Sequence, residues 1–348
     1  MITSTVYRND HSYSGPISML KKLNNGHVVL VFKEALRRGS VTHGDPTTRT
    51  SLIRSTDNGK TWHTQVTPDP AGGNGTAVNQ FSDGTLLVNN FRWVFVPLSR
   101  KEELQHVGGY REIDQLGMAT ALGGIFTARS GDSGYTWEPP QKMETPGFES
   151  VSTAGRVLEL ADHTLLAPMN GKNSDDVSSR CWVMASTDGG FTWGMSGTLA
   201  SMQGEVDFHE LRMVVVSTGR ILGLMRTAGN FYQCHSDDGG KTWSATRETP
   251  IWCGGSSPAD LLLLADGRVL CTYGHRRPPY GVRACLSEDG GQTWDLRQEI
   301  VLRDDGLGWD LGYPSSEQVD DRTILTVYYW HEKDQIRHLV GTRWSLDL

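Results

Sequence analysis

An eight-residue pattern, Ser-x-Asp-x-Gly-x-Thr-Trp, occurs five times in this chain of 348 residues and constrains its fold more than any other feature. The copies begin at Ser55, Ser130, Ser186, Ser236 and Ser287, so successive copies start 75, 56, 50 and 51 residues apart. Self-similarity at a period near 50 residues is typical of chains built from repeated supersecondary units. The sequence therefore predicts a repeat protein.

Each copy has the composition of a tight turn that leads into a strand. The Asp side chain can accept hydrogen bonds from nearby backbone N–H groups, the Gly permits a positive φ, and Thr and Trp favour a strand. Five of the 11 Trp residues stand at the last position of the pattern. We expect each of these Trp side chains to fix its hairpin against a neighbouring unit.

A second repeat lies between the copies of the first. Six polar turns each precede a short apolar run, which is typical of an inner hairpin with a buried strand. The runs are Val28 to Phe32, Leu86 to Val88, Leu165 to Pro168, Ile221 to Met225, Val269 to Tyr273 and Ile324 to Tyr328. Six inner hairpins and five outer turns predict an all-β fold, a six-bladed β-propeller of four-stranded antiparallel blades.

The sixth blade lacks the eight-residue pattern, and the N-terminal residues offer the strand that it needs. Pairing this N-terminal strand with the last blade closes the ring and removes two open sheet edges. The expected blades are residues 14–70, 71–145, 146–200, 203–250, 252–303 and 308–348 with 1–8. Because the repeats follow one another without a linker, we expect residues 1–348 to form a single domain.

Blade 2 carries an insertion at about residues 98–118, which explains the long first spacing. The segment from Lys101 to Leu116 is charged, and we expect it to contain one short helix near a blade mouth. Insertions of this kind gather on one face of a propeller and often serve function. Two interpretations of the insertion remain open: an element with a function, and a solvent-exposed loop without one.

Composition excludes several classes of partner and cofactor. A net charge of −7 argues against nucleic acid, and no apolar stretch approaches the ~20 residues of a membrane span. The first residues lack the pattern of a signal peptide, which predicts a cytoplasmic protein, or a secreted one if a leader has been removed.

The five Cys are expected to be buried free thiols. Neither Cys nor His has metal-site spacing, so no metal and no other cofactor is expected. The oligomeric state stays open.

The fivefold pattern is the Asp-box, and through it the chain resembles the sialidase (neuraminidase) superfamily of BNR or Asp-box repeat propellers. The resemblance covers the whole chain through the repeat count. It implies an exo-acting glycoside hydrolase that removes a terminal acidic sugar, sialic acid or a related one, from an oligosaccharide or glycoconjugate. Because the Asp-box itself marks a scaffold, function has to be argued from the site.

The superfamily holds a substrate carboxylate with three arginines and uses a Tyr nucleophile, a Glu base and an Asp acid. Blade 4 runs from Glu210 through a strand, a turn and a second strand to Arg226, so the resemblance implies Glu210 as base and Arg226 as a clamp arginine. Blade 6 reads Gly-Tyr313-Pro, which implies Tyr313 as nucleophile. Blade 1 reads His43-Gly-Asp45-Pro, which implies Asp45 as acid.

The remaining substrate-binding candidates are less closely tied to the pattern. Arg283 stands before the fifth Asp-box, where the superfamily places a clamp arginine, and Arg276 and Arg277 are rivals for that role. His43 adds a candidate near the mouth of blade 1. The first clamp arginine is absent, because the matching place reads Tyr-Ser-Gly-Pro-Ile; Arg37 or Arg38 is a candidate to replace it.

The chemistry of the implied site is consistent with an acidic sugar. A neutral phenol avoids the repulsion that a carboxylate nucleophile would meet, and a neighbouring Glu can accept its proton. Asp45 would need a raised pKa to act as acid, which enclosure could supply. Two alternatives remain open: a polysaccharide or oligosaccharide lyase acting on a uronic acid, with His43 or Tyr313 taking the proton, and a non-catalytic glycan-binding propeller.

Overall fold

The five Asp-box turns are held by one repeated set of hydrogen bonds. In the first copy, Ser55 Oγ donates to Asp57 Oδ1 at 2.7 Å and accepts from the Gly59 N–H at 2.8 Å. Asp57 accepts from the N–H and the hydroxyl of Thr61 at 2.9 and 2.6 Å, and Gly59 has a φ of 76°. The same contacts recur at Asp132, Asp188, Asp238 and Asp289. Each turn thus stabilises itself locally.

The strands that these turns connect form six antiparallel sheets. The computed structural model describes residues 1–348 except 39–43, 149, 174, 199–205, 254–256 and 347–348. Blade 1 consists of β2 (Ser12–Lys22), β3 (Val28–Leu36), β4 (Arg49–Ser55) and β5 (His63–Asp69). Blade 2 consists of β6 (Asn74–Gln80), β7 (Leu86–Pro97), β9 (Met118–Ser130) and β10 (Gln141–Met143), with β8 (Arg111–Ile113) paired to β9. Blade 3 consists of β11 (Ser150–Ser152), β12 (Leu158–Glu159), β13 (Leu165–Lys172), β14 (Arg180–Ser186) and β15 (Gly194–Thr198).

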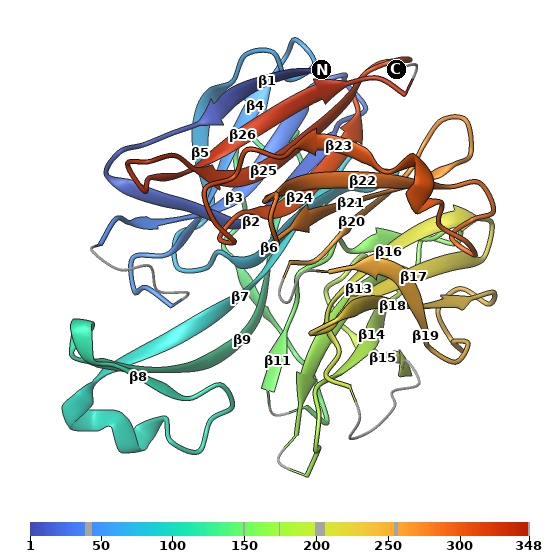
Figure 1. Ribbon diagram of the computed structural model, residues 1–348. Coiled ribbons are helices and arrows are strands. Elements are labelled where there is room, and N and C mark those ends of the chain that lie inside the picture. The colour runs from blue at the N-terminus through green and yellow to red at the C-terminus, as the bar shows by residue number, and fades with distance from the viewer. Residues whose placement is uncertain (39–43, 149, 174, 199–205, 254–256, 347–348) are drawn as a thin grey trace.

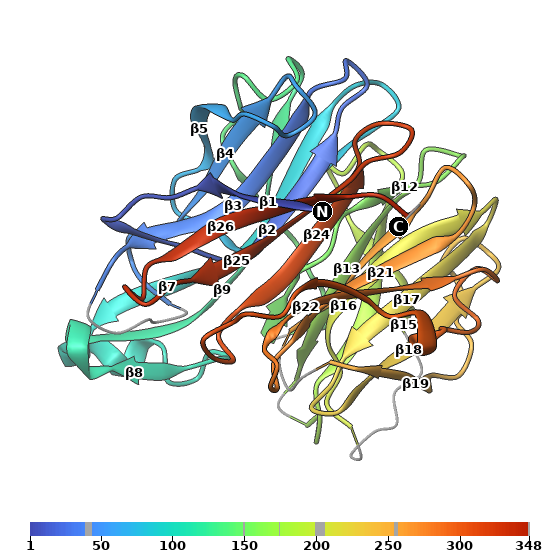
Figure 2. The same ribbon diagram turned by 45° about the horizontal axis from the view of Figure 1, so that its top comes forward.

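The second half of the chain repeats the arrangement three more times. Blade 4 consists of β16 (His209–Ser217), β17 (Arg220–Arg226), β18 (Asn230–Ser236) and β19 (Arg247–Trp252). Blade 5 consists of β20 (Asp260–Leu263), β21 (Val269–His275), β22 (Gly281–Ser287) and β23 (Ile300–Arg303), with the 3₁₀ helix η3 (Leu296–Gln298) before its last strand. Blade 6 consists of β24 (Gly312–Gln318), β25 (Ile324–His331), β26 (Arg337–Trp344) and the N-terminal β1 (Ile2–Tyr7). The predicted six-bladed β-propeller is confirmed (Figures 1 and 2).

The N-terminal strand closes the ring as expected. β1 pairs with β26 in the order β1-β26-β25-β24, and Thr3 lies opposite Thr342 with their hydroxyl oxygens 3.0 Å apart. Figure 1 shows β1 lying beside β26 at the top of the molecule. This pairing completes the fourth strand of a blade that has no Asp-box.

The hydrophobic core is divided into six clusters, one between each pair of neighbouring blades. Each Asp-box Trp packs into the cluster between its own blade and the preceding one; these are Trp62, Trp137, Trp193, Trp243 and Trp294. In the cluster between blades 5 and 6, buried Trp344 takes this place although blade 6 has no Asp-box. The expectation that the Trp fixes a hairpin to its neighbour is confirmed. The five Cys are buried free thiols, as expected.

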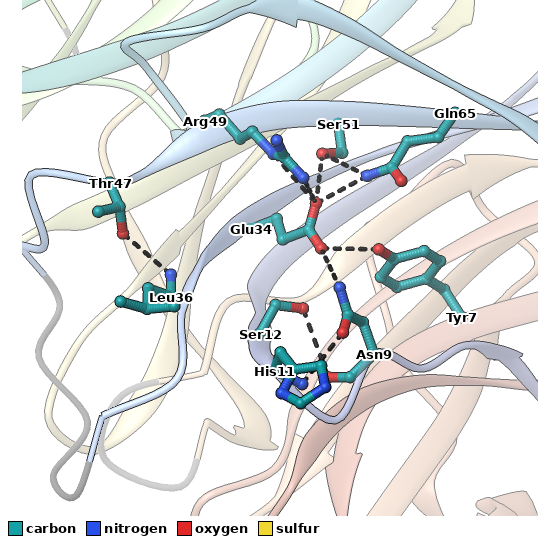
Figure 3. A network of polar contacts seen from close by, with 10 residues as sticks. All are labelled: Tyr7, Asn9, His11, Ser12, Glu34, Leu36, Thr47, Arg49, Ser51 and Gln65. Carbon is teal, nitrogen blue, oxygen red and sulfur yellow. Dashed lines mark hydrogen bonds and ion pairs between the residues drawn. The ribbon is translucent and has the colours of Figure 1, made fainter.

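A polar network joins the closing strand to blade 1. Buried Glu34 of β3 accepts hydrogen bonds from Tyr7 of β1 at 2.6 Å, Ser51 at 2.8 Å and Gln65 at 2.7 Å, and it also pairs with Arg49 at 2.9 Å (Figure 3). Burial alone would raise the pKa of Glu34, but these donors outweigh it and lower the pKa to about 2. The carboxylate therefore stabilises the junction of the first and last blades while it stays charged.

The blade 2 insertion, residues 98–117, projects away from the ring between the long strands β7 and β9 (Figures 1 and 2). The expected single helix is wrong in detail, because the segment holds two 3₁₀ helices, η1 (Leu98–Glu103) and η2 (Asp114–Leu116), with β8 between them. Within the described residues, no helix has the length and apolar character needed to cross a membrane.

Candidate active site

Four inner strands carry a backbone irregularity near their first residues. The pairing register shifts between Ser14 and Ser18 in β2, Asn74 and Ala77 in β6, His209 and Arg212 in β16, and Gly312 and Ser315 in β24. Inside these four bulges, φ is positive at Ile17 (72°), Gly75 (63°), Glu210 (48°) and Tyr313 (50°). A left-handed backbone at a non-glycine residue costs about 1–3 kcal/mol, and bulges of this kind re-aim side chains. Two of the residues implied for catalysis thus sit at equivalent strained positions of blades 4 and 6.

The structure brings Tyr313, Glu210 and Arg226 into direct contact. The Tyr313 hydroxyl donates to Glu210 Oε1 at 3.1 Å, and Arg226 Nε pairs with the other carboxylate oxygen of Glu210. Two buried polar groups hold the backbone of the pair, because Asn170 Oδ1 accepts from Glu210 N–H at 3.1 Å and Ser257 Oγ accepts from Tyr313 N–H at 3.2 Å. The Glu carboxylate therefore lies between a phenol and a guanidinium, in position to take the phenol proton.

The electrostatics of this cluster follow from burial and from its own charges. Burial, and then the Glu210 charge, raise the pKa of Tyr313, while Arg276 and Arg226 oppose the rise. Burial would lower the pKa of Arg226, but the Glu210 charge outweighs it, so the pKa lies above the usual value. Burial and the Arg226 charge lower the pKa of His209, which keeps this imidazole neutral at pH 7. In the resting site, Tyr313 is a neutral phenol beside an ion pair.

The three residues line a cavity of about 250 Å³ at the convergence of five blades. Its apolar walls come from Pro16, Ile17, Phe91 and Trp93. Its principal polar and charged groups are Asn74, Arg111, Asn170, His209, Glu210, Arg226 and Tyr313. This volume lies just below the roughly 300–1,000 Å³ of typical small-molecule sites, and it suits a single sugar ring better than a chain.

Arg276 lies beside this cluster. Its guanidinium carbon is 5.3 Å from the centre of the Tyr313 ring and 5.6 Å from that of Trp309, whose side chain is 60% exposed. Its Nη2 donates to the Tyr329 hydroxyl at 2.7 Å, and its Nε donates to the Leu311 carbonyl at 2.9 Å. Of the three arginines considered in blade 5, Arg276 is the one that approaches Tyr313, whereas the guanidinium carbon of Arg277 lies 4.4 Å from the centre of the Trp252 ring.

Arg283 and Arg37 lie away from this cluster, contrary to the sequence-based expectation. Arg283 stands in the middle of β22 and turns towards the outer strand, where it donates to the Arg303 carbonyl at 2.7 Å and pairs with Glu299 at 3.6 Å. Arg37 donates to the backbone carbonyls of Asp10 and Asp334 at 3.4 and 3.2 Å, on the outer side of blade 1. Among the described residues, neither side chain has a hydrogen bond or ion pair with Tyr313, Glu210 or Arg226, so the structure gives these two predictions no support. His43 lies outside the described residues.

Asp45 is buried behind the cavity wall, with its carboxylate already paired. It accepts from Arg38 Nε, and from the Thr47 N–H and hydroxyl at 2.9 and 2.6 Å. Burial would raise the pKa of Asp45, but the hydrogen bonds from Arg38 and Thr47 outweigh it and hold the pKa below its usual value. The expectation that enclosure raises this pKa is therefore wrong for the arrangement seen. Arg38, one candidate for the absent clamp, serves Asp45 instead.

Sequence reasoning missed several residues of the cavity. Asn74 lies on its wall and accepts from the buried Lys33 ammonium at 2.9 Å; burial lowers the pKa of Lys33 to about 7, although the Asp45 charge opposes this. Arg111 enters the cavity from the insertion, with its guanidinium carbon 4.2 Å from the centre of the Trp93 ring. The charged insertion was the available signal, but no pattern singled out Arg111. Among the described residues, no cluster of His, Cys, Asp and Glu could hold a metal ion.

Comparisons with known proteins agree on the family and the fold. A family model described as a BNR repeat-like domain matches residues 113–327, and one described as a BNR/Asp-box repeat matches residues 53–64. A sialidase of Bacteroides fragilis (strain YCH46) is 27% identical over 301 residues, covering 80% of this chain and 53% of the relative. The chain thus spans about half the length of that curated relative.

Solved structures resemble the chain over its whole length. A protein of unknown function from Dyadobacter fermentans DSM 18053 is 26% identical, with a TM-score of 0.85 and coverage of 99% of this chain and 97% of that one. The Hadza microbial sialidase Hz136 is 20% identical, with a TM-score of 0.76 over 99% of this chain and 69% of that one. The intramolecular trans-sialidase from Ruminococcus gnavus is 16% identical, with a TM-score of 0.70 over 99% and 97%. The last two likenesses show a shared propeller fold.

Proposed function

Because the chain belongs to the BNR repeat-like family of propellers within the sialidase superfamily, we propose that it is a sialidase-like glycoside hydrolase. We place its action at a terminal acidic sugar, sialic acid or a related one, on an oligosaccharide or glycoconjugate. The observation that carries the proposal is the Tyr313–Glu210 hydrogen bond of 3.1 Å, with Arg226 on the second carboxylate oxygen, in a cavity sized for one sugar. The sialidase of Bacteroides fragilis adds support at the level of the family.

In the proposed mechanism, Tyr313 attacks the anomeric carbon while Glu210 takes the phenol proton. The bond from the phenol oxygen to the sugar forms as the bond to the leaving oxygen breaks, giving a covalent intermediate that water then hydrolyses. A free phenol with a raised pKa is a weak nucleophile, so transfer of its proton to Glu210 during the attack is the step that the 3.1 Å contact favours. Arg226 and Arg276 flank the phenol and stabilise negative charge as it develops.

The leaving oxygen needs a proton, and Asp45 is the residue proposed to supply it. Its carboxylate is held charged by Arg38 and Thr47 in the resting arrangement. Asp45 can donate only after these contacts loosen and its pKa rises, which substrate enclosure would bring about by excluding water. With an activated leaving group such as 4-methylumbelliferone, this step matters less, so an Asp45→Asn variant should retain more activity on that substrate than on a natural glycoside.

Replacement of Tyr313 by Phe tests the proposal directly. Hydrolysis of 4-methylumbelliferyl N-acetyl-α-neuraminide, followed by fluorescence, should fall by at least about 10³-fold, since the variant has no nucleophile or proton to transfer. The thermal unfolding midpoint checks that the fold survives, because the change removes one hydrogen bond worth about 1 kcal/mol. Wild-type rates in a folded Tyr313→Phe variant would contradict the role of the phenol.

A second candidate function is elimination from a uronic acid, and His209 is the observation that favours it. This imidazole lines the cavity and is kept neutral by burial and the Arg226 charge, as a base for proton abstraction should be. A lyase would release an unsaturated sugar that absorbs ultraviolet light, whereas a hydrolase releases a saturated one. Digestion of acidic oligosaccharides, read by absorbance and by mass, separates the two reactions.

A further inference from the structure

The cavity contains a cationic group that no residue described by the structure neutralises. No hydrogen bond or ion pair joins the Arg111 guanidinium to any residue that the structure describes, and its Nε and Nη2 are hidden from solvent. The Nε1–H of Trp93, on whose ring Arg111 stacks, likewise has no acceptor among those residues. Both side chains line the same cavity as Glu210 and Arg226. A desolvated guanidinium without a partner costs free energy, so an acceptor from outside the described residues would stabilise these donors.

A neighbouring arginine of the same blade shows what Arg111 lacks. Arg92 donates hydrogen bonds from its Nε and Nη2 to the two carboxylate oxygens of Asp69, at 3.0 and 2.8 Å. The corresponding two nitrogens of Arg111 have no partner. Arg226, in contrast, is already engaged with Glu210. Among the arginines that line the cavity, Arg111 therefore has the unused capacity for an anion.

The insertion holds Arg111 in this position by close packing. β8 pairs with β9 through Arg111 opposite Thr120, and buried Ile113 lies on the same side of β8 as Arg111. The preceding loop depends on two glycines: a Cβ on Gly108 would lie 2.3 Å from Ser150, and Gly109 has a φ of 75° with Trp93 and Leu122 close by. The loop is thereby fixed against blades 2 and 3, while the Arg111 guanidinium has no counter-ion among the described residues.

We propose that Arg111, supplied by the blade 2 insertion and supported by the Trp93 Nε1–H, binds the acidic group of the substrate. This inference rests on the proposed function, because it names the group that selects a substrate for the Tyr313–Glu210 site. A planar carboxylate fits the guanidinium fork and accepts from both of its nitrogens. The blade 2 insertion is then a specificity element, and the apolar Pro16–Ile17 wall of blade 1 needs no cation of its own.

The test compares an acidic substrate with its neutral counterpart in matched variants. The substrates are 4-methylumbelliferyl N-acetyl-α-neuraminide and its methyl ester. The variants are Arg111→Met, which keeps the packing on Trp93 without the charge, and Arg111→Lys, which keeps the charge without the fork. Arg100→Met is the control, because Arg100 lies in the same insertion, is exposed and pairs with Glu103. Thermal unfolding midpoints of all variants are compared with that of the wild type.

We expect Arg111→Met to lower kcat/KM on the acid on the order of 10- to 100-fold and on the ester by less than about twofold. Arg111→Lys should fall between wild type and Arg111→Met, and Arg100→Met should match wild type on both substrates. An unchanged ratio of acid to ester in Arg111→Met overturns the assignment while the proposed function stands. So does an equal loss on both substrates, which would mark a structural role.

Binding separates failure of this inference from failure of the proposed function. If wild type cleaves neither substrate, N-acetylneuraminic acid and glucuronic acid are titrated by calorimetry into wild type and Arg111→Met. Binding that is lost in Arg111→Met supports anion recognition by Arg111 and shows that the reaction was assigned wrongly. Equal binding by the two proteins, or no binding of either acid to wild type, overturns the inference.

Discussion

At the scale of single residues, the same pair of side chains serves two purposes in this molecule. Tyr7 donates to Glu34 at 2.6 Å, and Tyr313 donates to Glu210 at 3.1 Å. The Glu34 oxygens accept from further donors of blade 1, whereas among the described residues the Glu210 carboxylate contacts Tyr313 and Arg226. The first pair is saturated and stabilises the fold. The second lines a cavity and keeps capacity to take a proton.

Replacing Glu34 by Gln should make the protein less stable in a pH-dependent way. The folded-state pKa of about 2 lies below the ordinary value of 4.5, so the carboxylate contributes stability above the unfolded-state pKa and loses it as pH falls through the folded-state pKa. The unfolding free energy of Glu34→Gln should be lower than that of wild type by about 3 kcal/mol at neutral pH. The gap should close as pH falls from about 4.5 to about 2.

Urea unfolding at several pH values measures this difference. Glu102→Gln is the matched control, because Glu102 is an exposed residue of the insertion and the change should leave the unfolding free energy within about 0.5 kcal/mol. A difference between wild type and Glu34→Gln that stays constant with pH would show that lost packing, and not the charge, is responsible.

At the scale of single elements, four of the inner strands combine regular antiparallel pairing with one β-bulge. The bulges at Ile17, Gly75, Glu210 and Tyr313 each break the register near the start of the strand. Local sequence could not predict them, because a β-branched Ile strongly disfavours a positive φ and Asn74-Gly-Thr76 reads as an ordinary turn. The apolar runs of the second strands were predictable, since turn residues and buried β-formers mark them directly.

Replacing Gly75 by Ala should disrupt the bulge of blade 2. A Cβ at this position would lie 1.7 Å from the Thr153 carbonyl oxygen of blade 3, and φ is 63°. Because a backbone atom cannot yield as a flexible side chain can, we expect the unfolding free energy to fall by more than about 2 kcal/mol. Activity should fall as well, since neighbouring Asn74 lines the cavity.

Gly84→Ala is the matched control for this change. Gly84 also has a positive φ, 90°, but a Cβ there meets nothing within 4 Å. Its substitution should cost about 1–2 kcal/mol from backbone conformation alone. Chemical unfolding of the two variants, side by side, isolates the contribution of the contact with Thr153. Equal losses would mean that φ, and not the neighbouring blade, decides the requirement for glycine.

At the scale of the whole molecule, the sequence predicted the ring better than the site. The Asp-box count, the apolar runs and the spare strand at the N-terminus determine six closed blades, because each feature depends on short-range sequence. Which side chains meet depends on the place of each residue along its strand. Arg283 and Arg276 are seven residues apart in sequence, yet Arg283 pairs with Glu299, just before the outer strand β23, while Arg276 lies past the end of β21, beside Tyr313. Arg111 reaches the cavity from the blade 2 insertion, a segment that has no counterpart in the other repeats with which it could be aligned.

A disulfide across the seam of the ring should stabilise the entire propeller. Thr3 and Thr342 face each other between β1 and β26, with hydroxyl oxygens 3.0 Å apart, so a pair of Cys residues there has suitable proximity. The bridge would close nearly the whole chain into a loop, and the loop-entropy model gives an upper limit of roughly 6 kcal/mol. The thermal midpoint of the oxidised Thr3→Cys/Thr342→Cys variant should exceed that of its reduced form.

The single variant Thr342→Cys shows the cost of losing the Thr342 hydroxyl, which lies 2.7 Å from that of Tyr328. The native Cys residues are buried, so they should not compete for oxidation under mild conditions. If the bridge forms and the midpoint does not rise, opening of the β1–β26 seam is not the event that starts unfolding.

The four left-handed positions also have a consequence for how such a protein can change. They recur in blades 1, 2, 4 and 6, at Ile17, Gly75, Glu210 and Tyr313. Of the two that bear no reactive group, Gly75 is closed to substitution by the Thr153 carbonyl oxygen, whereas Ile17 lines the same cavity as Glu210 and Tyr313. Mutagenesis restricted to Ile17 is therefore an economical route to new chemistry in this cavity.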